Sequence, residues 1–181
     1  MARFGPSAES RTSRRAPSDL EHPELVRRAQ LGSAAAFEQL VLSFGPDVHR
    51  FLTLRLRNES DVRDTLQETL TAAWQALPSL DSPHKLRPWL IGIAAHKAAD
   101  VVRGRAPGGE HEPAQYGRED ESLFEIREAI LALPQQFRDV LLLRYLLQLS
   151  EEEVAVALGI RLGTVKSRTA RARAALSEHL R

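Results

Sequence analysis

A run of basic residues near the C-terminus offers the clearest chemistry in the sequence. Between positions 161 and 173 five residues are basic and none is acidic: Arg161, Lys166, Arg168, Arg171 and Arg173. Such side chains neutralise DNA phosphates and can donate hydrogen bonds to guanine. The hydroxyl groups of Thr164 and Ser167, which can serve bases or phosphates, lie among them. The segment therefore indicates DNA binding.

The residues around this run have the spacing of a helix-turn-helix. Ala155 is small enough for two helices to approach, Gly159 can adopt the left-handed turn, and Val165 can pack the second helix on the first. Ser150 and Glu153 match a capping box at the start of the first helix. An ordinary helical hairpin uses the same residue types, but here three glutamates open the first helix and the second is basic. We expect six side chains to face the major groove: Arg161, Thr164, Lys166, Ser167, Arg168 and Arg171.

The remaining sequence predicts an all-α protein of two small helical domains joined by a flexible linker. Residues 20–105 and 123–181 have apolar residues at three- and four-residue spacing. Residues 106–122 are polar and lack this period, so we expect a linker with a root-mean-square span of about 20–24 Å and a stretched limit of about 55 Å. Residues 1–19 have almost no large apolar residues, which predicts a disordered tail.

Within the first domain, glycine, proline and small polar residues predict where helices end. These signals lie at Gly32-Ser33, at Gly45-Pro46, at residues 58–60 and at residues 78–83. They divide the domain into about four helices after a short first turn. In the second domain we expect helices at residues 123–133, 134–148, 151–158 and from 162 onward, with Pro134 in a first turn.

Composition excludes several classes of function. The 181 residues carry a net charge of +1 and include no cysteine, which excludes a disulfide scaffold, a thiol nucleophile and a Cys-ligated zinc site. No apolar run is long enough to span a bilayer and no secretory signal is visible, so we expect a cytoplasmic protein without membrane contact. Six scattered histidines and the lack of phosphate-loop, zinc-helix or serine-elbow motifs predict no metal, cofactor or catalytic residue.

Several segments of the chain resemble one family. Ala132-Leu133-Pro134, residues 138–140, Leu149-Ser150 and the run Gly163 to Arg168 resemble region 4 of the extracytoplasmic-function sigma factors. In the first half, residues 61–74 resemble region 2.2, and residues 87–103 resemble regions 2.3 and 2.4. The resemblance covers residues 20–105 and 123–178.

The resemblance implies a transcription initiation factor that binds core RNA polymerase and promoter DNA. Region 2.2 would dock on the clamp of the β′ subunit through a polar helix face formed by Asp61, Asp64, Gln67 and Glu68. Regions 2.3 and 2.4 would recognise and open the −10 element with Asp81, Ser82, His84, Lys85, Arg87, His96, Lys97 and Arg103. Region 4 would read the −35 element and pack on the β flap. An anti-sigma factor is a further possible partner.

Two other classes of protein stay open at this point. A dimeric regulator could use the same helix-turn-helix, although the chain shows no sustained heptad for a dimer seam. An interaction scaffold could carry the basic helix incidentally. One apolar helix face could meet the β flap or form part of the core, and the core is the favoured interpretation; its residues are Phe137, Val140, Leu141 and Tyr145. Trp89 could stack on an unpaired base, but for it too a place in the core is favoured.

Overall fold

The computed structural model describes residues 23–56, 58–104 and 128–179. Within these ranges every regular element is helical, which confirms the all-α prediction. The expected tail at 1–19 and the expected linker at 106–122 lie outside the described residues. None of the described helices is both long enough and apolar enough to cross a bilayer.

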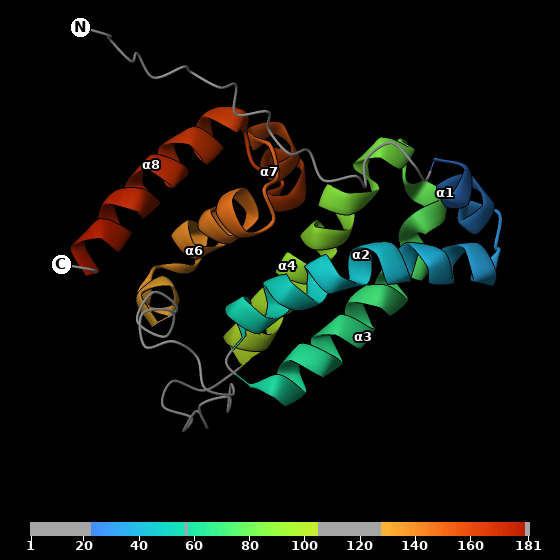
Figure 1. Ribbon diagram of the computed structural model, residues 1–181, viewed down its shortest axis with the longest axis horizontal. Helices are drawn as coiled ribbons and strands as arrows, with labels where there is room; N and C mark the ends of the chain where they lie inside the picture. Colours follow the sequence, from blue (N-terminus) through green and yellow to red (C-terminus); the bar gives the residue numbers. More distant parts are fainter. Residues whose placement is uncertain (1–22, 57, 105–127, 180–181) are drawn as a thin grey trace, which may run out of the picture.

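Four α-helices form the N-terminal part of the fold (Figure 1). They are α1 (Pro23–Gln30), α2 (Ala34–Arg55), α3 (Glu59–Ala76) and α4 (Leu86–Gly104), with the short 3₁₀ turns η2 (Leu77–Ser79) and η3 (Pro83–Lys85) before α4. The side chains of Ser33 and Asn58 cap α2 and α3 by accepting hydrogen bonds from backbone N–H groups. Helices α2, α3 and α4 pack on one another. Phe51 and Ile91 are almost fully buried among them.

The expected helix boundary at Gly45-Pro46 is wrong. Helix α2 continues through both residues, with Pro46 in its interior. Proline cannot donate the backbone hydrogen bond that a helix interior normally makes, so its presence costs stability. Phe44 and Val48 are buried on either side of it, at 4% and 0% exposure. Burying these two side chains in the core offsets the cost of the missing bond and keeps the segment helical.

The C-terminal helices follow the predicted order with one difference. After a helical turn at residues 128–132 come α6 (Gln135–Leu141), the π-helical turn η4 (Leu142–Leu146), α7 (Glu151–Leu158) and α8 (Leu162–His179). The helix expected at residues 134–148 is thus an α-helix that widens into a π turn and ends early. The capping box of Ser150 and Glu153 is present, and Gly159 has a left-handed φ of 62°, as predicted.

The two groups of helices are in contact. Helix α7 packs on α4, and η4 lies against α2. Figure 1 shows α6 and α8 on one side of the molecule and α2 and α3 on the other, with α4 reaching toward the C-terminal group. One hydrophobic core includes buried residues of both groups, such as Leu52, Ile91, Leu143 and Val154.

Candidate nucleic-acid interface

Helix α8 has one face fixed in the core and one face open to solvent. Val165 and Ala172 are fully buried, and α8 packs on α6 and α7. The turn between α7 and α8 is closed by the backbone N–H of Ile160, which donates to the Ala155 carbonyl at 3.1 Å. These contacts produce the helix-turn-helix that the sequence predicts. The buried side chains fix the orientation of α8, and therefore the direction in which its basic side chains point.

The side chains proposed for the −35 element lie at the start of α8 and differ in exposure. Arg161, Lys166, Ser167 and Arg171 are exposed, whereas Thr164 and Arg168 are half-buried. The Nζ atom of Lys166 lies 3.8 Å from a carboxylate oxygen of Glu151, too far for a strong hydrogen bond. The Ser167 hydroxyl donates to the Thr164 carbonyl at 3.1 Å. The basic groups thus remain available for a polyanion.

The segment proposed to capture the −10 strand forms the turn η3 and its flanks. Asp81, His84 and Lys85 are exposed, and Ser82 is half-buried. The Lys85 backbone N–H donates to the Ser82 carbonyl at 3.0 Å, which holds the turn compact. Two prolines, at positions 78 and 83, limit the backbone of this segment. The result is a rigid loop that presents several polar side chains together.

Arg87 departs from the expectation that it faces DNA. Its side chain is 8% exposed, its Nε atom donates to an Asp47 carboxylate oxygen at 2.8 Å, and its Nη2 atom donates to the Leu147 carbonyl at 2.8 Å. The guanidinium therefore connects α4 to α2 and to the residue that follows η4. In this arrangement Arg87 holds helices together and is not presented to a nucleic acid.

The other −10 candidates lie along α4. His96 is exposed, and its Nδ1 atom is 2.7 Å from the Gly92 carbonyl. Arg103 is exposed and forms an ion pair with Asp100 one turn earlier. Lys97 lies 3.2 Å from a carboxylate oxygen of Glu68 on α3. The structure therefore brings a residue proposed to bind DNA into contact with one proposed to bind polymerase.

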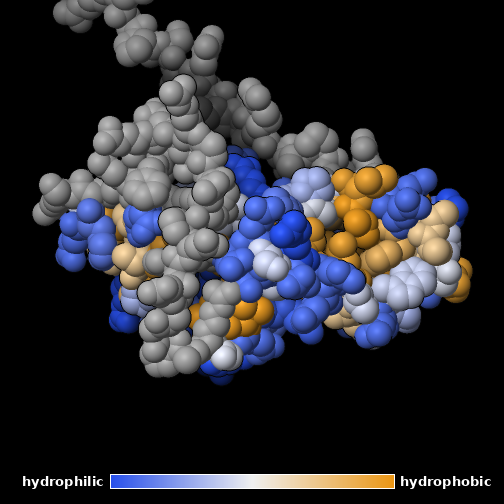
Figure 2. Space-filling view, turned by 90° about the horizontal axis from the view of Figure 1, so that it is seen from below, coloured by the Kyte–Doolittle hydropathy of each residue, from blue (hydrophilic) through white to orange (hydrophobic). Residues whose placement is uncertain are grey.

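The polar face expected on α3 is present. Asp64, Gln67 and Glu68 are exposed and Asp61 is half-buried. The three exposed residues line a shallow groove of about 420 Å³. The other lining residues are Thr71, Ala72 and Gln75 of the same helix and Lys97 of α4. Figure 2, seen from below, shows a largely hydrophilic surface in the centre of the view and apolar residues gathered toward the right.

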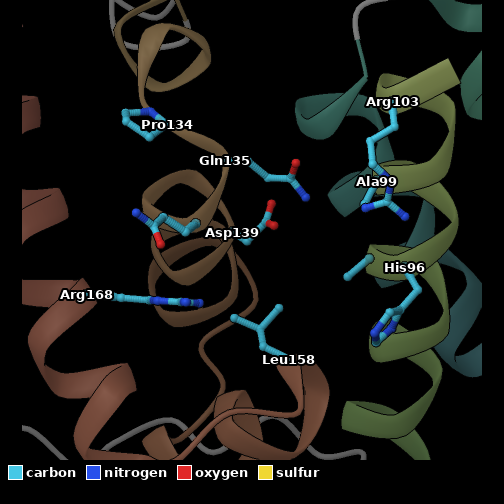
Figure 3. A pocket seen from close by; sticks show the side chains of 10 residues that line it. His96, Ala99, Arg103, Pro134, Gln135, Asp139, Leu158 and Arg168 are labelled. Carbon is cyan, nitrogen blue, oxygen red and sulfur yellow. The ribbon is translucent and has the colours of Figure 1, made fainter. Parts of the chain in front are cut away.

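A second groove, of about 510 Å³, lies between α4 and the C-terminal helices. Figure 3 shows His96, Ala99 and Arg103 on the α4 side and Arg168 on the opposite side, with Asp139 between them. Candidate DNA-binding residues from both halves of the chain therefore share one groove. Within the described residues, no group of three or more His, Cys, Asp or Glu side chains could hold a metal ion.

Asp139, which lines this groove, belongs to an ion pair that the sequence analysis missed. The Nε atom of Arg55 lies 2.7 Å from a carboxylate oxygen of Asp139, and the two side chains are 1% and 8% exposed. Burial raises the pKa of Asp139 above its ordinary value, although the positive charges of Arg55 and Arg138 oppose the shift. A signal was present in the sequence, because Arg55 lies between Leu54 and Leu56, and Asp139 directly precedes the apolar run Val140 to Leu143.

The comparisons with known proteins agree with this geometry. Residues 40–107 match "Sigma-70 region 2" and residues 123–176 match "Sigma-70, region 4". The chain is also 33% identical to the ECF RNA polymerase sigma factor SigC of Mycobacterium tuberculosis, over 84% of this chain and 87% of that protein. The chain belongs to the extracytoplasmic-function group of the sigma-70 family. Its helices α2 to α4 are therefore those of a sigma region 2, and α6 to α8 those of a region 4.

Two solved structures are similar to this sigma factor over most of its length. One is CnrH, a protein of Cupriavidus metallidurans, in complex with the cytosolic domain of CnrY, with a TM-score of 0.72 and 30% identity over 87% of this chain and 95% of that chain. The other is RpoE from Bartonella quintana in complex with the anti-sigma factor NepR, with a TM-score of 0.65 and 27% identity over 80% and 96% of the two chains. The family predicted from the sequence is confirmed, and with it a role in transcription initiation through regions 2 and 4.

Proposed function

We propose that this sigma factor binds core RNA polymerase in the cytoplasm and directs it to promoters by reading two DNA elements. Helix α8 reads the −35 element from the major groove, and region 2 captures the −10 strand. The observation that carries the proposal is the orientation of α8. Its buried Val165 and Ala172 anchor one face, which leaves the basic and hydroxyl side chains on the other.

Reading of the −35 element would combine phosphate and base contacts. Lysine and arginine bind phosphates irrespective of sequence, whereas arginine can also pair with guanine through two hydrogen bonds. Arg161, Lys166 and Arg171 are exposed basic groups of this motif. We assign a base contact to Arg168 and a phosphate contact to Lys166, with Thr164 and Ser167 serving bases or phosphates.

Opening of the −10 element needs a place for an unpaired base and cations for its backbone. Unstacking a base costs a few kcal/mol, which contacts with the separated strand must offset. The polar turn at Asp81, Ser82, His84 and Lys85 supplies hydrogen-bonding groups within a rigid loop. His96, Lys97 and Arg103 on α4 would follow the phosphates of the same strand.

Polymerase binding is assigned to the polar face of α3. Asp64, Gln67 and Glu68 lie at three- and four-residue spacing and are exposed together, so they could meet basic groups of the β′ clamp. In region 4, Val140 and Leu141 are buried in the core, whereas Tyr145 is 56% exposed. Tyr145 is therefore the side chain of that helix face that is best placed to contact the β flap.

A protein inhibitor is a second proposed partner. RpoE, which shares the fold of this chain, is in complex with the anti-sigma factor NepR. The groove between α4 and the C-terminal helices offers charged groups of both signs, including Asp139 and Arg168. An anti-sigma factor that contacts both regions would keep them from DNA.

The test is run-off transcription with purified core polymerase on a pool of promoter fragments from the source genome. Defined start sites that appear only when the protein is added would support the proposal and supply the −35 and −10 sequences. If core polymerase stays inactive while the protein alone still shifts duplex DNA, a conventional helix-turn-helix regulator becomes the better description.

A further inference from the structure

The groove of about 510 Å³ between α4 and the C-terminal helices has two walls that are held in place by direct contacts. Gly92 of α4 lies against the backbone of Ala157 on α7, where a Cβ atom would not fit. The Arg55–Asp139 ion pair joins α2 to α6. These contacts define the joined arrangement of regions 2 and 4. The groove is therefore formed by the chain itself, and its volume lies within the range of about 300–1,000 Å³ that is usual for small-molecule sites.

Three basic side chains from the two walls border the same space (Figure 3). His96 and Arg103 come from α4, and Arg168 comes from α8. Arg168 is half-buried, and within the described part of the chain no hydrogen bond or ion pair engages its guanidinium. A charge that is partly removed from water without a partner costs free energy, which a bound anion would recover. The Arg168 guanidinium thus marks a place for an anionic group.

The two side chains of the α4 wall can bind an anion as well. Arg103 forms an ion pair with Asp100 in which both side chains are largely exposed. A pair of this kind contributes little to stability, so Arg103 can exchange it for another anion. The Nδ1 atom of His96 lies 2.7 Å from the Gly92 carbonyl, which leaves its Nε2 atom available to a ligand. Cations on opposite walls favour a ligand with more than one negative charge, such as a phosphate chain.

Asp139 is the one acidic side chain among the described residues that line the groove. Its carboxylate oxygen lies 2.7 Å from the Nε atom of Arg55, so its negative charge is already compensated. The Arg55–Asp139 pair is neutral as a whole. An anion in the groove would therefore interact chiefly with the uncompensated positive charge of Arg168 and with Arg103.

The rest of the lining is apolar or neutral and polar. The apolar part consists of Ala95, Ala99, Pro134 and Leu158, and the polar part is the amides of Gln135 and Gln136. An apolar wall suits the face of a flat ring, and an amide can both donate to and accept from the polar edge of that ring. An inorganic anion would use the cations alone, whereas a nucleotide would use all three kinds of group.

We propose that this groove is a binding site for a nucleotide. The phosphates lie among His96, Arg103 and Arg168, and the base lies against the apolar lining and the two glutamine amides. Since the site takes side chains from both regions, a bound nucleotide stabilises the joined arrangement by mass action. The site rests on the geometry of the groove and not on the proposed reading of DNA. An anti-sigma factor seated over the groove would compete with the nucleotide.

The first test is isothermal titration calorimetry of the full-length chain with ADP and, separately, with GDP. We expect one nucleotide per chain with a Kd below about 1 mM for at least one of the two. Pyrophosphate lacks the base and should bind more weakly, and adenosine lacks the phosphates and should not bind. If neither nucleotide binds, or if pyrophosphate binds as tightly as both, the nucleotide assignment is overturned.

The substitution Arg168→Gln locates the site, and Arg173→Gln is its matched control. Each removes one positive charge from α8, but Arg173 is exposed and lies outside the groove lining. We expect Arg168→Gln and Arg103→Gln each to weaken nucleotide binding about tenfold or more, because each removes a charged hydrogen-bond donor. Arg173→Gln should bind as the parent chain does. An equal loss in Arg173→Gln would show that binding follows the overall charge of α8, which would overturn the site.

Thermal unfolding gives a second readout and a check on folding. The Tm of the parent chain should rise with nucleotide concentration, and the rise should be smaller in Arg168→Gln. Without nucleotide, Arg168→Gln should keep the parent Tm, since the side chain has no described partner to lose. If a polyglutamate peptide raises the Tm while ADP and GDP do not, the groove binds an acidic protein segment and the nucleotide proposal is wrong.

Discussion

The surface of α8 and the interface between regions 2 and 4 use charge in opposite ways. Lys166 and Arg171 on α8 and Arg161 just before it are exposed and without strong ion pairs. At the interface, Arg55, Asp139 and Arg87 are buried, and each is bound to a partner. An exposed charge costs little free energy when it is left unpaired, so it can remain available to bind a polyanion. Buried charges are tolerated only when paired, and they therefore determine which helices lie together.

The largest expected effect comes from breaking the buried pair. Arg55→Ala would leave Asp139 as an uncompensated charge, at a cost of about 3–5 kcal/mol for the joined arrangement. We expect urea unfolding, followed by circular dichroism, to lose its single cooperative transition, because regions 2 and 4 would no longer support each other. The control is Arg63→Ala, since its pair with Glu59 is exposed at both ends and 3.8 Å long. A single, unchanged transition in Arg55→Ala would show that the buried pair does not stabilise the contact between regions 2 and 4.

The basic side chains of α8 should act on affinity and not on stability. Arg168→Ala should weaken binding to the −35 duplex by about 1–3 kcal/mol if the residue pairs with a base. Lys166→Ala should lower the slope of log affinity against log salt by about 0.9 if it contacts one phosphate. Titration of labelled duplex at several salt concentrations checks both effects. Unchanged affinity and slope would show that α8 does not read DNA through these residues.

The smallest expected effect is a pH dependence of the contact between regions 2 and 4. Because burial raises the pKa of Asp139, the joined arrangement holds this proton more tightly than a separated one, where the carboxyl is solvated. The joined arrangement is therefore favoured at low pH and loses this contribution as the pH rises through the raised pKa. The urea midpoint of the parent chain should rise as the pH falls toward that pKa.

The variant Asp139→Asn separates this effect from other titrations. Arg55 and Arg138 also face the carboxyl, and Arg168, His96 and Arg103 line the same groove. Asparagine removes only the ionisable group at position 139, so the remaining pH dependence belongs to the other residues. An identical pH profile in the parent chain and in Asp139→Asn would show that Asp139 does not control the contact between regions 2 and 4.

The sequence predicted local features well because they depend on neighbouring residues. The capping box at Ser150 and Glu153, the left-handed turn at Gly159 and the burial of Val165 all follow from short-range spacing. The break expected at Pro46 failed because burial of Phe44 and Val48 outweighs a local preference. Tertiary packing often overrides propensity in this way.

The interface could not be predicted from spacing, because its partners lie far apart in the chain. Arg55 and Asp139 each differ from their neighbours only as a charge beside apolar residues, and nothing in the sequence pairs them. Arg87 was expected at DNA because of the resemblance to regions 2.3 and 2.4, but its partners Asp47 and Leu147 come from elsewhere in the fold. The type of a residue indicates which bonds it can make, whereas the fold decides which of them it makes.

The close contact between α4 and α7 also gives a way to compare sigma factors by sequence. A Cβ atom built on Gly92 of α4 would lie 2.6 Å from the carbonyl oxygen of Ala157 on α7, so any larger residue there would prevent this approach. Sigma factors with glycine at the equivalent position could join regions 2 and 4 as this one does, whereas those with a larger residue would need another arrangement. A single column of an alignment would then separate the two groups.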